Sequence, residues 1–164
     1  MTYIDIDKAI VDIIKDKCAE CKARLDLVSR DNPTERKALQ LEYGMYTFCG
    51  NAGAMFNGCD RRKALEIRQR FLSGVISDYP RLKEAYGKID YDEKLRFIAA
   101  LGAELYIRDQ WLGMQKAELA AAEASGDINK VLEFKIKIGS VENMFAAWER
   151  WRRENNVYPD MFEE

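Results

Sequence analysis

Three helix-length stretches of the chain carry apolar residues at alternating intervals of three and four positions. The stripes are Val11, Ile14, Cys18, Cys21, Leu25 and Val28; Ala38, Leu41, Met45, Phe48, Ala52 and Met55; and Val131, Phe134, Ile138, Val141, Phe145 and Trp148. This spacing keeps one face of an α-helix apolar, and such faces pack against neighbouring helices at shallow angles. No stretch shows the sustained two-residue alternation of a strand. The pattern therefore predicts an all-α fold.

Capping residues, prolines and glycines divide the chain into five or six helices. The predicted helices cover residues 7–29, 33–56, 60–76, 81–86, 90–124 and 127–155. Asp5 or Asp7 is the expected cap of the first helix. Whether the second helix breaks near Gly50 is left open, because an interior glycine costs about 1 kcal/mol relative to alanine. The short connector around Gly126 makes the last two helices antiparallel neighbours. We predict a single-domain bundle over residues 1–156 that ends in a long antiparallel αα-hairpin, followed by an extended C-terminal tail over residues 157–164.

The composition fits a folded domain with balanced charge. The chain has 164 residues, of which 48% are hydrophobic and 33% charged, enough for one domain with a substantial core. Its 26 lysines and arginines nearly balance 28 acidic residues, which argues against a histone-like nucleic-acid binder and against a strongly acidic DNA mimic. The first residues lack the pattern of a signal peptide, and no apolar stretch approaches the length of a membrane span. We expect a cytoplasmic protein that does not contact a membrane.

The four cysteines admit more than one interpretation. Cys18 and Cys21 have the spacing of half a zinc site, and Cys49 and Cys59 could supply two further thiolates. The first pair, however, occupies consecutive positions of the first apolar stripe, where a free cysteine behaves as a small hydrophobic residue. Core packing is the favoured interpretation, with metal binding and redox chemistry as alternatives. We therefore predict neither a metal site nor a cofactor.

Two arginines interrupt predicted apolar faces. Arg68 lies between Leu65 and Leu72, and Arg108 lies within the stripe of the fifth predicted helix. They are candidates for anion binding, because the planar guanidinium suits carboxylates and phosphates. The favoured interpretation is an internal ion pair, since Glu104 precedes Arg108 by one helical turn.

Two further clusters are candidates for binding. The third predicted helix carries a basic patch, which could contact nucleic-acid phosphates or could be an ordinary solvated face. Near the C-terminus, tryptophan and arginine residues, which are enriched at protein interfaces, precede an apolar tail that either folds back or contacts a partner. The basic-patch residues are Arg61, Arg62, Lys63 and Arg70, and the partner-binding candidates are Arg150, Trp151, Arg153, Tyr158, Met161 and Phe162.

The sequence gives little indication of catalysis. It contains no histidine, the commonest general base and a ligand of many helical metal sites. The best candidate row of carboxylates for a metal site is Asp12, Asp16 and Glu20, spaced four residues apart. Lysines lie between them, which is typical of a solvent-exposed helix face. We expect a non-catalytic protein-binding module, an adaptor or an inhibitor of a larger protein, such as a phage or another mobile element could encode. A nucleic-acid-associated protein and a carboxylate-metal enzyme are the alternatives, and a homodimer is compatible with the stripes.

Overall fold

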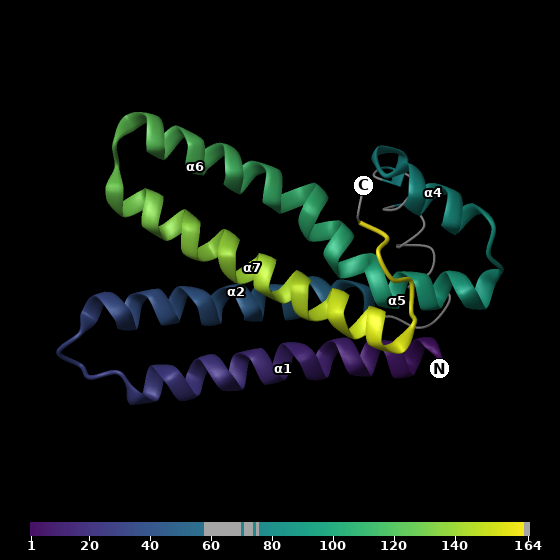
Figure 1. Ribbon diagram of the computed structural model, residues 1–164, viewed down its shortest axis with the longest axis horizontal. Helices are drawn as coiled ribbons and strands as arrows, with labels where there is room; N and C mark the ends of the chain where they lie inside the picture. Colours follow the sequence, from purple (N-terminus) through teal and green to yellow (C-terminus); the bar gives the residue numbers. More distant parts are fainter. Residues whose placement is uncertain (58–69, 71–73, 75, 163–164) are drawn as a thin grey trace.

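The fold is known from a computed structural model, which describes residues 1–57, 70, 74 and 76–162, with side chains omitted for 53–57. In these residues the chain forms helices and turns, without a strand, and the predicted all-α bundle is confirmed (Figure 1). The helices are α1 (Tyr3–Leu27), α2 (Pro33–Asn57), the 3₁₀-helix η1 (Ile76–Asp78), α4 (Pro80–Gly87), α5 (Tyr91–Ile107), the π-helical turn η2 (Arg108–Leu112), α6 (Gly113–Ser125) and α7 (Ile128–Asn155). None of the described helices is long and apolar enough to cross a bilayer.

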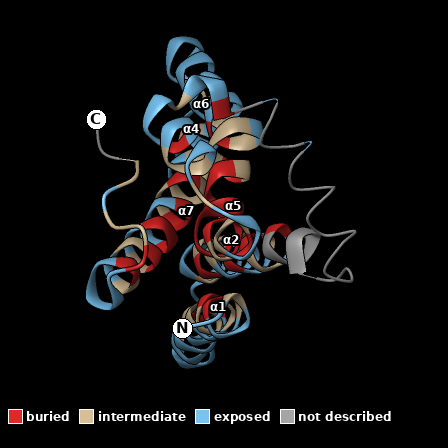
Figure 2. Cartoon of the chain, turned by 90° about the vertical axis from the view of Figure 1, so that its right-hand side faces the viewer, coloured by how far each residue is buried: buried red, intermediate tan, exposed pale blue. Residues whose placement is uncertain are grey.

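Helix α5 lies at the centre of the bundle. It packs against α1 and α2, and α7 crosses α2 while also contacting α1 and α6 (Figure 1). Most of α5 from Leu95 to Ile107 is buried, and Figure 2 shows the buried residues of α5, α2 and α7 facing one another. The core therefore runs along α5, and the helix pairs α1–α2 and α6–α7 extend from it toward the same end of the molecule.

The third apolar stripe is buried from Ile138 onward and half-buried at Val131 and Phe134, whereas most of the second stripe is only half-buried. On α7 the residues from Ile138 to Trp148 in that stripe are buried. On α2 the buried residues are Ala52, which belongs to the stripe, and Leu39, Tyr46 and Cys49, which do not. The predicted positions Ala38 and Leu41 lie half-buried beside α7. Because α2 contacts α1, α5 and α7, it has apolar residues on more than one side. The stripe predicted from the spacing of apolar residues begins on the side next to α7.

Helix α1 begins earlier than predicted. The Thr2 hydroxyl accepts a hydrogen bond from the Asp5 N–H, and the Asp5 carboxylate accepts one from the Thr2 N–H at 2.7 Å. This reciprocal capping box starts the helix at Tyr3, so the predicted cap at Asp5 or Asp7 is wrong. The early start adds Ile6 to the helix, and Ile6, Ile10 and Ile14 form its buried face at intervals of one turn.

Helix α2 continues without a break through Gly50 to Asn57, a point that the sequence left open. A Cβ atom at Gly50 would lie 3.4 Å from the Ile14 side chain of α1. The two helices therefore pack closely at Gly50, with room for little more than a methyl group there. Cys21 on α1 donates to the Leu39 carbonyl oxygen of α2 at 3.3 Å and adds a polar contact between the same helices.

The predicted helix over residues 90–124 is present as α5, η2 and α6. Its ends follow the expected caps: the Asp90 carboxylate accepts from the Glu93 N–H at 2.9 Å, and Gly126 adopts a left-handed conformation with φ of 72°. Asp127 then caps α7, which packs against α6. What the sequence did not indicate is the π-helical turn, a widened turn of the kind that often occurs at functional sites in helices.

The C-terminal tail, residues 156–162, forms successive turns and folds back, instead of the extended segment expected from the sequence (Figure 1). Asn156, Tyr158 and Asp160 all have positive φ values, at 51°, 43° and 60°. Such a conformation is unfavourable for a bulky residue such as tyrosine, so contacts of the tail with the bundle must hold it.

Candidate functional site

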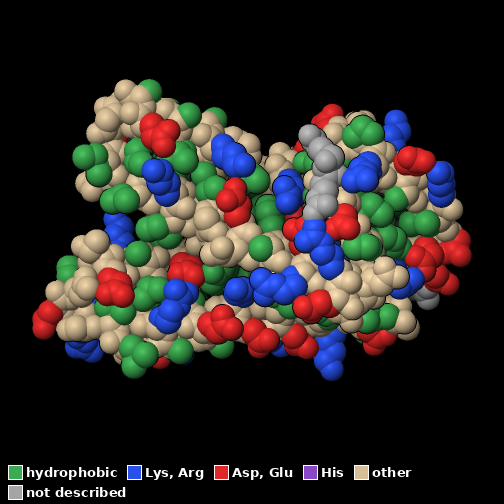
Figure 3. Space-filling model, viewed as in Figure 1, with side chains coloured by type: hydrophobic (Ala, Val, Ile, Leu, Met, Phe, Trp, Pro, Cys, Tyr) green, Lys and Arg blue, Asp and Glu red, His purple; other side chains and the backbone are tan. Residues whose placement is uncertain are grey.

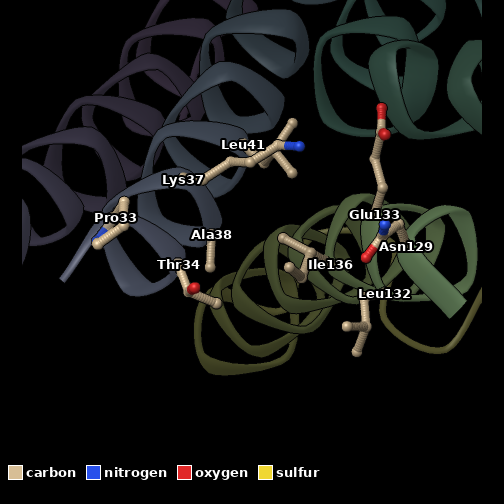
Figure 4. Close-up of a pocket in the computed structure, with 9 residues that line it drawn as sticks. All are labelled: Pro33, Thr34, Lys37, Ala38, Leu41, Asn129, Leu132, Glu133 and Ile136. Atoms are coloured by element: carbon tan, nitrogen blue, oxygen red, sulfur yellow. The ribbon is translucent and has the colours of Figure 1, made fainter.

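An apolar groove opens between the N-terminal parts of α2 and α7. It encloses about 470 Å³ (Figure 4). Its lining residues are Pro33, Thr34, Lys37, Ala38 and Leu41 from α2, and Asn129, Leu132, Glu133 and Ile136 from α7. We call this site the α2–α7 groove.

The groove follows from the way the two helix pairs separate. Figure 1 shows that the α1–α2 turn and the α6–α7 turn lie apart at the same end of the molecule, and Figure 3 shows hydrophobic side chains around the hollow between them. In Figure 4, Thr34 and Ala38 extend from α2 toward α7, where Ile136 faces them. The floor of the groove therefore consists of small and aliphatic side chains from both helices.

Large apolar side chains remain exposed at this end of α7. Leu132, in the wall of the groove, is 54% exposed, and Ile128, one turn earlier, is 72% exposed. Charged groups stand at the edge: Glu133 accepts from Lys137 at 2.9 Å, and this hydrogen bond is the main cause that lowers the pKa of the Glu133 carboxyl. An apolar floor with charged edges suits the apolar face of an amphipathic helix.

A second feature is a buried ion-pair cluster, the charge centre, formed by Glu104, Arg108 and Arg152. One oxygen of Glu104 accepts from Arg108 Nε at 3.1 Å and Nη2 at 2.8 Å, and the other accepts from Arg152 Nη1 at 2.8 Å. The side chains of Glu104 and Arg152 are each 1% exposed, whereas that of Arg108 is 29% exposed. The structure thus contains the predicted internal pair of Glu104 with Arg108 and adds a second arginine to it.

Aromatic rings cover the two arginines. The guanidinium carbon of Arg108 lies 4.6 Å from the ring centre of Phe145 and 4.7 Å from that of Phe162, and Arg152 lies 5.7 Å from the Phe162 ring. Cation–π contacts of this kind stabilise a guanidinium that is partly removed from water. The tail residue Phe162 therefore contacts both arginines of the charge centre.

Other contacts hold the tail against the bundle. The Tyr158 hydroxyl donates to the Glu93 carboxylate at 2.5 Å, and this hydrogen bond is the main cause that lowers the pKa of Glu93. Burial first, and the Glu93 carboxylate second, raise the pKa of the Tyr158 phenol. Asp160 accepts from Arg153 at 2.5 Å.

The six partner-binding candidates thus have different environments. Trp151, Tyr158, Met161 and Phe162 are partly buried against the core. Arg150 and Arg153 are exposed, and Arg153 pairs with Asp160. Sequence reasoning left open whether the tail folds back or meets a partner, and the structure shows it folded back.

The described cysteines pack in the interior of the α1–α2 pair. Cys21 and Cys49 are buried and Cys18 is half-buried, all as free thiols. Burial raises the pKa of all three, that of Cys49 to about 12. Cys59 lies outside the described residues. Among those that are described, no group of three or more histidine, cysteine, aspartate or glutamate side chains is arranged to hold a metal ion.

The remaining candidates are only partly visible. Arg61, Arg62, Lys63 and Arg68 lie outside the described residues, and Arg70 is exposed. Nucleic-acid binding through the basic patch, and anion binding by Arg68, therefore stay predictions. The row of carboxylates formed by Asp12, Asp16 and Glu20 is exposed on α1.

Sequence reasoning missed Arg152 and the groove. Arg152 follows Trp148 by four residues and so continues the apolar stripe of α7 by one more step. Its place on the apolar face of the helix could have indicated that Arg152 is buried. The groove had no comparable signal, because it depends on how far two helix pairs separate.

Comparison with known proteins found no match: no family model, no curated protein and no solved structure corresponds to this chain.

Proposed function

We propose that this chain is a non-catalytic protein-binding module, an adaptor or inhibitor, whose partner inserts an amphipathic helix into the α2–α7 groove. The observation that carries the proposal is the exposed apolar wall formed by Leu132 above the floor of Ala38, Leu41 and Ile136. Burying aliphatic side chains is worth about 25 cal/mol per Å² of apolar surface removed from water. A helix seated between α2 and α7 would cover this wall.

The geometry favours a helix over an extended peptide. The described part of the chain has no sheet edge to which a strand could add, and the groove runs between two helices (Figure 4). Helices bind such grooves through apolar residues spaced three and four positions apart. Lys37 on one wall and Glu133 on the other offer charges of both signs to the edges of the bound helix.

The test compares two charge substitutions at exposed apolar positions. Leu132→Glu places a carboxylate in the wall of the groove, whereas Met114→Glu, the matched control, changes a 62% exposed residue of α6 that does not line it. Both variants should unfold at nearly the wild-type temperature, because neither side chain is buried. Affinity capture from cells, with quantitative mass spectrometry, should retain a partner with the wild type and with Met114→Glu but lose it with Leu132→Glu.

Two results would count against the proposal. If Leu132→Glu retains the same proteins in the same amounts, the groove is not the binding surface. If light scattering shows a homodimer that Leu132→Glu dissociates, the groove is an interface between two copies of this chain. A photo-crosslinking residue at position 132 adds a direct readout, because it should label the partner at an apolar helical segment.

A further inference from the structure

A small cavity lies beside the charge centre, of which it shares Arg108, and it has no lining residue in common with the α2–α7 groove. It has a volume of about 210 Å³ and lies where η1, the start of α4, the π-helical turn and the tail meet. Its lining includes Asp78, Tyr79, Arg81, Arg108, Met161 and Phe162. Cationic, hydroxyl and apolar groups from four separate segments thus converge on one space.

Arg108 is fixed in place with part of its hydrogen-bonding capacity unused. Glu104 accepts from Nε and Nη2 on one edge of the guanidinium. The ring centres of Phe145 and Phe162 lie 4.6 and 4.7 Å from the guanidinium carbon. A guanidinium has five N–H groups. The three that Glu104 does not use have no hydrogen-bond partner among the described residues, and they belong to the outer edge formed by Nη1 and Nη2.

The charge balance at this place favours an anion. Arg108 and Arg152 share the single carboxylate of Glu104, so the charge centre carries one positive charge in excess. In the cavity lining, Arg81 adds a second cation beside Asp78, the one acid among the lining residues. One guanidinium N–H of Arg81 donates to the Asp160 carbonyl oxygen at 3.4 Å, which places this cation next to the tail.

Two further observations point to a ligand. The Tyr79 hydroxyl has no hydrogen-bond partner among the described residues, although the residue is half-buried and its ring packs edge-on against Phe162 at 6.0 Å. Arg108 is also the first residue of the π-helical turn, and π-turns within α-helices are frequent at functional sites. The two residues that carry an unused hydroxyl and an unused guanidinium edge therefore both line this cavity.

We propose that this cavity binds the carboxylate group of a small organic acid, held by the outer edge of Arg108 and by the Tyr79 hydroxyl. A carboxylate is favoured over phosphate because the unused donors of Arg108 lie in one plane and match two coplanar oxygens. A single excess positive charge at the charge centre also suits a monoanion. The organic part of the acid packs against Met161 and the Phe162 ring. The inference is independent of the α2–α7 groove.

The experiment is a titration of the whole protein followed by two-dimensional NMR. The probes are sodium propionate and sodium benzoate, with sodium chloride and sodium phosphate at matched ionic strength. With at least one carboxylate, the chemical shifts of Tyr79 and of the Arg108 Nε–H should change until they reach a plateau. With chloride and phosphate, these chemical shifts should change without reaching a plateau. A peptide with a free C-terminal carboxylate, compared with its C-terminal amide, distinguishes a protein source of the same group from a free acid.

Variants test the two donors separately. Tyr79→Phe keeps the ring and removes one hydrogen bond, so affinity should fall about fivefold. Arg108→Lys keeps the charge toward Glu104 but loses the planar fork, so affinity should fall roughly tenfold or more. Arg24→Lys is the matched control, because Arg24 pairs with Glu42 on the α1–α2 surface and does not line the cavity. This variant should leave the affinity for the carboxylate unchanged.

Three results would overturn the proposal. One is the absence of saturable shifts with every carboxylate probe, free or peptide-borne. Another is tighter binding of phosphate than of any carboxylate. The third is an unchanged affinity in both Tyr79→Phe and Arg108→Lys, with spectra that show both variants folded.

Discussion

The charge centre permits a quantitative test of what holds α5 to α7. In the variant Glu104→Gln, the carboxylate that Arg108 and Arg152 share becomes a neutral amide of nearly the same size. Arg152 then retains a full charge at 1% exposure without a counterion. Arg108, at 29% exposure, can keep part of its hydration and contributes much less to the loss.

The expected magnitude follows from this difference in burial. Removing one partner of a buried ion pair typically costs 3–5 kcal/mol, because the remaining charge stays in a medium of low polarity. The glutamine oxygen can still accept one hydrogen bond, so we expect the low end, about 3 kcal/mol. For a domain of this size, that corresponds to a fall of roughly 6–12 °C in the melting temperature.

Urea denaturation at pH 7, followed by circular dichroism, measures the free energy of unfolding. The informative companion is the double variant Glu104→Met with Arg152→Met, which replaces the buried pair by apolar side chains. We expect it to lie within about 1 kcal/mol of the wild type, since apolar replacement of a buried pair is often neutral or stabilising. The reasoning is refuted if Glu104→Gln costs less than about 1 kcal/mol, or if the double variant is less stable than Glu104→Gln.

Three further predictions concern the tail, the cysteines and α2. In Tyr158→Phe, the pKa of Glu93 should rise toward its ordinary value, because the phenol no longer donates to that carboxylate. In the wild type, the stability from this contact is present at neutral pH and is lost as the pH falls through the lowered pKa of Glu93; an unchanged NMR titration curve in the variant would contradict this. Cys49, whose pKa burial raises to about 12, should react with iodoacetamide at pH 8 only as fast as the fold opens, as peptide mass spectrometry can measure. Labelling at the rate of an exposed thiol would be inconsistent with that burial. Gly44→Ala should stabilise the protein by about 0.5–1 kcal/mol in urea denaturation, because Gly44 is exposed within α2 and a Cβ there meets no atom within 4 Å. A loss of stability would point to a contact at Gly44 that the geometry does not show.

The sequence predicted the helices well where local chemistry decides. Asp90, Gly126 and Asp127 lie at the predicted ends because capping depends on residues within one turn. The sequence was less informative where contact with a distant helix determines the structure. Glycine is a poor helix former, yet α2 continues through Gly50, where it packs closely against Ile14 of α1.

The candidate sites divide in the same way. The pair of Glu104 with Arg108 follows from their spacing of four residues on one helix, and it was predicted. The pair of Glu104 with Arg152 joins residues 48 positions apart, so it depends on how α5 and α7 are placed. The fold-back of Phe162 onto both arginines depends in addition on the turns of the tail.

The charge centre also explains why regular apolar stripes give one arrangement of helices. Aliphatic faces can slide along each other by a helical turn of about 5.4 Å and still bury similar areas. Such a shift between α5 and α7 would separate Glu104 from Arg152, now 2.8 Å apart, and would leave the buried charge of Arg152 without its counterion. Buried polar contacts fix the register of helices in coiled coils for the same reason. The pair therefore fixes α7 near its C-terminal end, whereas at its N-terminal end the walls of the α2–α7 groove are largely aliphatic and would be free to adjust to the helix that we propose binds there.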